Sequence, residues 1–287
     1  MRLPPLAGFL WVLSSVLSAG TPGEAVQARV TKDVNQGNPI VVHVVVALCD
    51  NRYQGIVPVP KAIGNGQDPG SNLYWGAGFG VRTFLVRQGG WQLLSQETVP
   101  VQGRLERIVL RKSLRREGKA ATVFLVADAW DGREIKAATV SFLALAAGWE
   151  AEVLTVKGRN GPVSLPAGGA SHLVAYVGHD GLMDFSLPPG PEPAAGAAAP
   201  GQAVRSAVVL ACASQAFFQP HLARGGSHPL LLTTNLMAPE AYTLDAAVTA
   251  WAQGGAAETV RDAAARAYAI YQKISLRSAH RLFTGEP

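Results

Sequence analysis

Residues 38–51, NPIVVHVVVALCDN, form an almost unbroken apolar run rich in β-branched side chains. A strand with one solvent-exposed face alternates apolar and polar residues. An unbroken run is instead typical of a strand buried on both faces, as in a parallel sheet covered by helices. Shorter runs of the same kind recur at 121–127, 172–177, 206–211 and 229–234. We therefore expect one buried sheet assembled from widely separated segments.

Helical patterns separate or follow these runs. Helices are predicted over 72–86, 133–147, 239–253 and 256–274. Asn72 and Asp131 are the candidate caps of the first two helices, and Asn160-Gly161 predicts the turn of a hairpin over 151–165. Alternating buried strands and helices predict an α/β fold, with a mostly parallel central sheet flanked by helices in a three-layer α/β/α arrangement.

The N-terminus has the features of a secretory signal peptide: a short basic start, an apolar run over 6–17 and then small residues. Cleavage is expected near Ala19, Ala25 or Ala28, so the signal peptide is assigned to residues 1–28. The mature protein is then secreted or periplasmic. The apolar run is shorter than the roughly 20 residues of a membrane-spanning helix, so no transmembrane segment is expected after cleavage.

The remaining chain, 29–287, is long enough for a single domain with its own core. Residues 188–202, PPGPEPAAGAAAPGQ, lack periodicity and predict a flexible loop, open to proteolysis. The net charge of +5 is modest, and the most basic segment is 104–119, RLERIVLRKSLRREGK. That segment could contact nucleic acid, but we interpret it as the solvated face of an ordinary helix or strand and expect no nucleic-acid partner.

Two of the apolar runs end in chemically reactive residues. The run LVAYV is followed by GHDG, which contains His179, and the run VVLA is followed directly by Cys212. Ligands of open parallel sheets bind outside the carboxyl ends of the strands. If the two strands are neighbours, the two side chains therefore open on the same edge of the sheet.

A histidine beside a cysteine favours the thiolate, which is the nucleophile of cysteine enzymes. A helix that starts just after Cys212 would favour the anion further. Acyl transfer also needs backbone N–H groups directed at the developing oxyanion, and Gly181 and the Cys212 amide are the candidates. The structural alternative is that His179 belongs to a turn and that Cys212 only packs in the core.

The blocks LVAYVGHDG and AVVLACAS resemble the two signature blocks of caspase-like cysteine peptidases of clan CD, in the same order. The similarity is greatest to the CHAT-type branch, where PLLLTTNLMAPEAYTLDAAVTAW also resembles the segment after the cysteine. The architectural resemblance extends over about residues 38–274, and only the two short blocks are specific. It implies a cysteine endopeptidase acting on a polypeptide, with His179 as general base or acid and Cys212 as nucleophile.

The chain departs from this family at one position, because glycine usually follows the histidine and here Asp180 does. A carboxylate beside the oxyanion would oppose the charge that develops there. Either Asp180 points outward and Gly181 takes over the glycine's role, or the site no longer cleaves peptide bonds. In the second case the domain is a catalytically silent binding or interaction module for a partner protein.

Other acidic residues follow the predicted strands. Asp50 is a candidate substrate-binding residue that would select a basic side chain before the scissile bond, with Asp180 as the competing candidate. Alternatively, Asp50 only shapes the turn with Asn51. Asp128 and Asp131 could form an acid pair, although helix capping is the simpler role for Asp131.

No metal and no cofactor are expected. His172 and His179 lie on one extended run with side chains tending to opposite faces, and the nucleophile-elbow, zinc-helix and phosphate-loop motifs are missing. The only cysteines, Cys49 and Cys212, could form a disulfide in an exported protein. With the strand order that the resemblance implies, their Cα atoms would lie about 10 Å apart, beyond the ~7 Å limit, which favours two free thiols.

Overall fold

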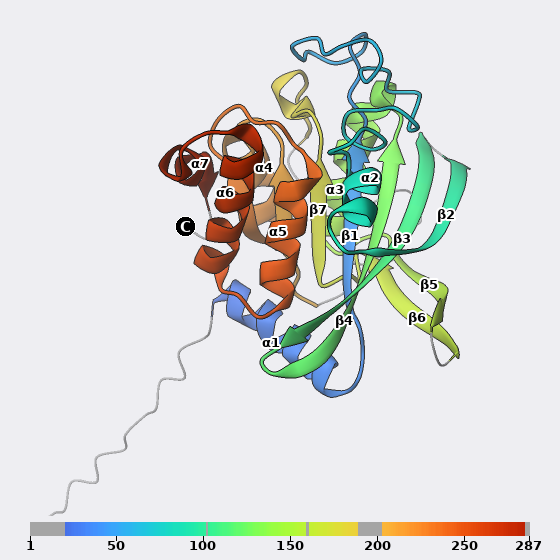
Figure 1. Cartoon of the computed structure of the whole chain (residues 1–287), viewed down its shortest axis with the longest axis vertical. Helices are drawn as coiled ribbons and strands as arrows, with labels where there is room; N and C mark the ends of the chain where they lie inside the picture. The colour runs from blue at the N-terminus through green and yellow to red at the C-terminus, as the bar shows by residue number, and fades with distance from the viewer. Residues whose placement is uncertain (1–20, 102, 159–160, 189–202, 285–287) are drawn as a thin grey trace, which may run out of the picture.

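The computed structural model describes residues 21–101, 103–158, 161–188 and 203–284 (Figure 1). The strands of its main sheet are β1 (Ile40–Ala47), β2 (Gln92–Val101), β3 (Arg104–Arg116), β4 (Lys119–Trp130), β7 (Leu173–Val177), β8 (Ser206–Leu210), β9 (His228–Thr233) and β10 (Phe283–Thr284). Their order across the sheet is β10-β9-β8-β7-β1-β4-β3-β2. The strands β4, β1, β7, β8 and β9 are parallel, whereas β2, β3 and β10 each pair in antiparallel fashion.

Helices cover both faces of this sheet. They are α1 (Pro22–Asn35), α2 (Val81–Arg87), α3 (Ile135–Ala146), α4 (Ser214–Gly225), α5 (Ala241–Ala252), α6 (Ala257–Gln272) and α7 (Leu276–Leu282). Side chains that alternate along β1 belong to different clusters: Val44 packs in the cluster with α1, α2, α5 and α6, and Val45 packs with α3 and α4. The predicted α/β fold, with a mostly parallel sheet flanked by helices, is confirmed at this level.

The predicted hairpin is also present, as the separate pair β5 (Ala151–Gly158) and β6 (Gly161–Gly168). It lies over the sheet on the same face as α3, where Val156 and Leu165 pack against Val41 and Phe124. Residues 159–160 of its turn lie outside the described residues. So does the predicted flexible loop, except for its first residue, because residues 189–202 are not described.

Two local predictions are wrong. Of the helix expected over 72–86, only the short α2 forms, and turns precede it. A Cβ on Gly76 would lie 2.1 Å from the Gly70 carbonyl oxygen, so the chain here is folded closely on itself rather than coiled into a helix. Asn72 caps no helix. Its side chain accepts from the Cys49 N–H (3.1 Å) and donates to the Cys49 carbonyl (2.8 Å), so it satisfies the backbone just past the carboxyl end of β1.

The basic segment forms β3 and the turn into β4, and it is not simply a solvated face. Arg107 and Arg116 are only 9% and 3% exposed. Arg116 donates to Gln27 (2.8 Å) and Thr31 (2.8 Å) of α1. Part of this positive charge is therefore used inside the molecule, where it joins the sheet to a helix.

The helix α1 lies partly within the predicted signal peptide. It begins with a capping box between Thr21 and Glu24, and its Val26 and Val30 are fully buried in the main core. Two of the three expected cleavage positions, Ala25 and Ala28, fall inside this helix. Within the described part of the chain, no helix has the length and apolar character needed to cross a membrane.

Candidate active site

The sheet brings the ends of β7 and β8 side by side. These strands pair in parallel with Val177 opposite Leu210, and the Gly178 N–H continues the ladder by donating to the Leu210 carbonyl (3.2 Å). His179 and Cys212 each stand two positions beyond the last paired residues, at the carboxyl edge, where the loop after β1 also lies (top of Figure 1). The two sequence-predicted residues therefore leave neighbouring strands at equivalent positions.

Gly178 allows the chain to leave β7 close to β1. Its φ is +156°, and a Cβ there would lie 2.8 Å from the Ala47 carbonyl oxygen. The hydroxyl of the buried Tyr176 then donates to the His179 carbonyl (2.9 Å). The glycine before the histidine is thus explained by close packing of two strand ends, and the backbone of His179 is fixed.

Asp184 holds the imidazole of His179. His179 is 8% exposed, and its Nε2 lies 2.7 Å from the Oδ2 of Asp184, which also accepts from the Gly55 N–H (3.1 Å). In the tautomer in which Nε2 donates to this carboxylate, Nδ1 of the ring is left as the acceptor. The 3₁₀ turn η2 (Gly181–Met183) folds Asp184 back onto the histidine.

Sequence reasoning missed Asp184. It lies inside the stretch GHDGLMDF, but an acid five positions after a histidine has no set orientation on a loop. The available signal was a second carboxylate after the glycine turn.

Cys212 stands just before α4, in a strained turn. Ala213, the N-terminal flanking residue of that helix, has a left-handed backbone with φ +48°, which is uncommon for a residue with a Cβ. The Cys212 Sγ contacts both backbone groups of Met237: its thiol donates to the Met237 carbonyl (3.6 Å), and the Met237 N–H donates to the sulfur (3.4 Å). The helix predicted after Cys212 is present, and Phe218 seats it against Phe142 and Tyr176.

The buried hydroxyls of Ser214 and Thr233 stabilise this turn through hydrogen bonds. The Ser214 hydroxyl donates to the Val209 carbonyl (3.0 Å), and the Ser214 N–H donates to the Thr233 hydroxyl (3.1 Å). The Thr233 hydroxyl in turn donates to the Ala211 carbonyl. These bonds tie the end of β8 to the start of α4 and to β9, so the position of Cys212 is set by a rigid strand-to-helix junction.

Asp180 points into the protein. It is fully buried, and its Oδ1 accepts from the Leu182 N–H (3.0 Å), which caps η2. Burial, helped by the charge of Asp184, raises the pKa of Asp180 to about 7. Of the two alternatives for Asp180, the one in which it points outward is therefore wrong. This carboxyl therefore stays protonated to a higher pH than an ordinary aspartate, and its neutral form adds no negative charge beside the candidate site.

Gly181 has a packing role. It is buried, and a Cβ at this position would lie 2.7 Å from the Phe185 ring. Its carbonyl accepts from the N–H groups of Asp184 (2.9 Å) and Phe185 (3.0 Å). The glycine is needed for this close turn, whatever its part in binding an oxyanion.

Asp50 is engaged within its own loop. It is 2% exposed, and its Oδ1 accepts from the N–H groups of Arg52 (2.8 Å) and Tyr53 (3.1 Å). Its Oδ2 accepts from the Gly66 N–H (3.2 Å) and the Gln67 side chain (2.7 Å). Four donors leave little acceptor capacity for a basic substrate side chain, which favours the turn-shaping alternative.

The two cysteines are both free thiols, and β7 lies between β1 and β8, the strands that they follow. Cys49 is fully buried. Burial, together with the charge of Asp50, raises the pKa of the Cys49 thiol to about 11. Cys49 is therefore a poor nucleophile, whereas Cys212 is partly exposed.

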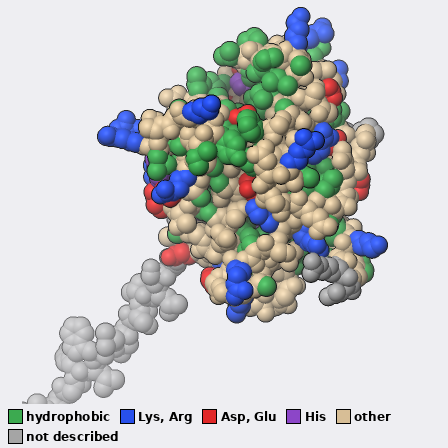
Figure 2. Space-filling view, viewed as in Figure 1, with side chains coloured by type: hydrophobic (Ala, Val, Ile, Leu, Met, Phe, Trp, Pro, Cys, Tyr) green, Lys and Arg blue, Asp and Glu red, His purple; other side chains and the backbone are tan. Residues whose placement is uncertain are grey.

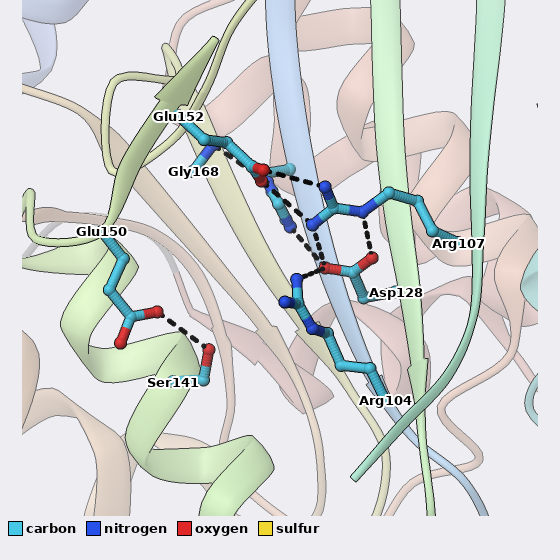
Figure 3. A network of polar contacts seen from close by, with 8 residues as sticks. Arg104, Arg107, Asp128, Ser141, Glu150, Glu152 and Gly168 are labelled. Atoms are coloured by element: carbon cyan, nitrogen blue, oxygen red, sulfur yellow. Dashed lines mark hydrogen bonds and ion pairs between the residues drawn. The ribbon is translucent and has the colours of Figure 1, made fainter. Parts of the chain in front are cut away.

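Asp128 and Asp131 do not form an acid pair. Asp131 accepts from the Arg133 N–H (2.9 Å) and so caps the turn before α3. Asp128 instead joins a buried network with Arg107 (2.6 Å), as Figure 3 shows from close by. The Oδ2 of Asp128 also lies 3.1 Å from Nε2 of His43. Burial alone would raise its pKa, but hydrogen bonds from Arg107 and His43 hold the pKa of Asp128 well below its usual range.

This network ties the hairpin to the sheet. Arg107 of β3 also binds Glu152 of β5 through two contacts of 2.9 Å, and the Gly168 N–H of β6 donates to Nδ1 of His43 (3.0 Å). All of its groups have partners in the protein, so we assign it a structural role.

His172 is part of the scaffold too. Its Nδ1 accepts from the Val41 N–H (3.1 Å), its Nε2 lies 2.8 Å from Asp33, and burial lowers its pKa to about 4. Among the described residues, no group of three His, Cys, Asp or Glu side chains could hold a metal ion.

Comparison with protein-family models, with curated proteins and with solved structures found no match for this chain.

Proposed function

We propose that this chain is an exported cysteine endopeptidase of caspase-like fold, with Cys212 as nucleophile and His179 as its proton-transfer partner. The observation that carries the proposal is the register of β7 and β8, which sets the two residues at equivalent positions of one sheet edge. The sequence resemblance of the two blocks supports the same assignment. The N-terminal apolar run supports export.

In the proposed reaction, His179 accepts the thiol proton of Cys212 and Asp184 stabilises the imidazolium that forms. The thiolate attacks the carbonyl carbon of the scissile peptide bond and forms a C–S bond. The C–N bond then breaks, and the amine leaves with the proton from His179. Water, deprotonated by His179, hydrolyses the thioester, which releases the acid product and restores the thiol.

The developing oxyanion would be bound by backbone N–H groups at Gly181 and Cys212. The buried Asp180 beside them carries a pKa of about 7. Since burial favours its neutral form, Asp180 opposes the oxyanion less than an exposed aspartate would. We propose that the departure from the family pattern is compatible with catalysis for this reason.

Cleavage of a peptide mixture by the purified protein, followed by mass spectrometry of the products, tests the proposal. We expect cleavage by the wild type and by Cys49→Ala, the matched control, and none by Cys212→Ala or His179→Ala. Cleavage that persists in Cys212→Ala would contradict the assignment. No cleavage at all, with Cys212 no more reactive than an ordinary thiol, would favour the silent binding module.

A further inference from the structure

A hollow of about 340 Å³ lies beside the Cys212 loop, between the segment after β9 and the helices α6 and α7. Its walls include Leu236, Tyr268, Gln272, Ile274 and Arg281. The volume is at the small end for ligand pockets. It therefore suits one large side chain better than a cofactor or a whole substrate.

The hollow and the thiol share a loop. The Asn235 carbonyl accepts from the Ala213 N–H (2.9 Å), and the Met237 N–H donates to the Cys212 Sγ (3.4 Å). Leu236, which lines the hollow, stands between these two anchored residues. A peptide whose scissile bond lies at Cys212 would therefore pass next to the hollow.

The lining is part apolar and part polar, and it carries one positive charge and no acid. Its apolar part is Leu236, Tyr268, Ile274 and Leu282, and its uncharged polar part is Thr234, Asn235, Gln272 and Ser278. Leu236 and Ile274 are 67% and 41% exposed, although both are large aliphatic side chains. The Tyr268 hydroxyl is engaged by the Ala238 N–H (3.0 Å), so its ring is the part that forms the wall. Arg281 is the charged residue of the lining, and no Asp or Glu lines this described hollow. Figure 2 shows hydrophobic side chains gathered over α6 and up to the loops at the top.

We infer that this hollow is a subsite that takes a large apolar side chain of a peptide substrate and disfavours a basic one. This inference rests on the proposed peptidase function and names its substrate class. Burial of a substrate side chain against Leu236 and Ile274 removes apolar surface from water, and Arg281 repels lysine and arginine. This apolar preference replaces the preference for a basic side chain that was expected from Asp50, because both carboxylate oxygens of Asp50 already accept hydrogen bonds within the protein.

The test uses the full-length mature protein and a peptide library with one position varied at a time. We expect leucine, isoleucine, phenylalanine or methionine to be selected at one fixed position. We also expect Ile274→Glu to lower kcat/KM for those peptides by about tenfold or more, without changing the alkylation rate of Cys212. The matched control is Ile270→Glu, which is 72% exposed on α6 and does not line the hollow; it should leave both rates unchanged.

The outcomes separate the two proposals. Cleavage with selection of arginine or lysine, or cleavage that Ile274→Glu leaves unchanged, would overturn this inference and leave the peptidase standing. If no peptide is cleaved, binding of a fluorescent leucine-containing peptide is measured by anisotropy. Binding that Ile274→Glu weakens and Ile270→Glu does not would retain the hollow as a peptide site while rejecting the peptidase. Loss of both activities would reject both proposals.

Discussion

Replacement of Asp180 by asparagine should change how the stability of this protein depends on pH. The folded-state pKa of Asp180 is raised to about 7 by burial, whereas an unfolded aspartate has a pKa of about 3.9. Between these values the folded protein binds a proton that the unfolded chain does not. Stability from this group is therefore fully present below about pH 4 and is lost as the pH rises through about 7.

The size of the effect follows from the two pKa values. At about 1.4 kcal/mol per pKa unit, ionisation of Asp180 should destabilise the fold by about 4 kcal/mol at pH well above 7. Asparagine can still accept from the Leu182 N–H and cannot ionise. Its amide brings donors to a place where Oδ2 of Asp180 has no partner among the described residues, which costs about 1–3 kcal/mol at every pH.

Urea unfolding of the wild type and of Asp180→Asn, at intervals from pH 4 to 9, measures how the free energy of unfolding of each protein depends on pH. Other groups that titrate in the range are shared by the two proteins, so the difference between their unfolding free energies isolates Asp180. We expect this difference to move in favour of Asp180→Asn by about 3 kcal/mol between pH 5 and 8. Two parallel curves would refute the argument that Asp180 is buried with a raised pKa.

Four further outcomes are expected. At pH 6, iodoacetamide should modify Cys212 much faster than Cys49 in the folded protein, because burial raises the pKa of Cys49 to about 11; equal rates by peptide mapping would contradict this. Asp184→Asn should slow that modification of Cys212 a few-fold, since a partly exposed ion pair is worth about 1 kcal/mol or less. Arg107→Met should lower the unfolding free energy by about 3–5 kcal/mol, because it leaves a buried carboxylate without its main partner; a loss below 1 kcal/mol in urea titration would contradict this. If the chain is exported, mass spectrometry of the processed protein should place its N-terminus near Ala19, because later cleavage would cut α1.

The layers of the fold could be predicted because unbroken apolar runs of this length are typical of strands that are buried on both faces of a sheet. The segments β1, β7, β8 and β9 are recognisable from their composition alone. The antiparallel strand β3 is not, because its arginines look solvated in sequence. Arg107 and Arg116 are buried only because Glu152, Asp128 and Gln27 meet them from distant parts of the chain.

Local propensity failed where the chain folds closely on itself. The segment before α2 contains aromatic residues at helical spacing, but Gly76 and Gly80 allow backbone approaches that no helix permits. A Cβ on Gly80 would lie 2.4 Å from the Trp75 backbone. Such contacts depend on tertiary packing. The glycines in the sequence indicate that the helix could be interrupted, but they do not show which backbone segments come close.

The placement of His179 and Cys212 at one sheet edge could be predicted because each follows a buried strand, and parallel strands present their carboxyl ends at one edge. The roles of the carboxylates around them could not, because each role depends on which donors the folded chain supplies. Asp50 meets four donors and becomes part of its loop. Asp184 meets His179 and the Gly55 N–H and becomes the partner of the imidazole. Asp180, which meets the Leu182 N–H and is otherwise enclosed, becomes a weak acid. Three aspartates with the same intrinsic chemistry thus have different partners and different tasks, and a sequence records only that they are aspartates.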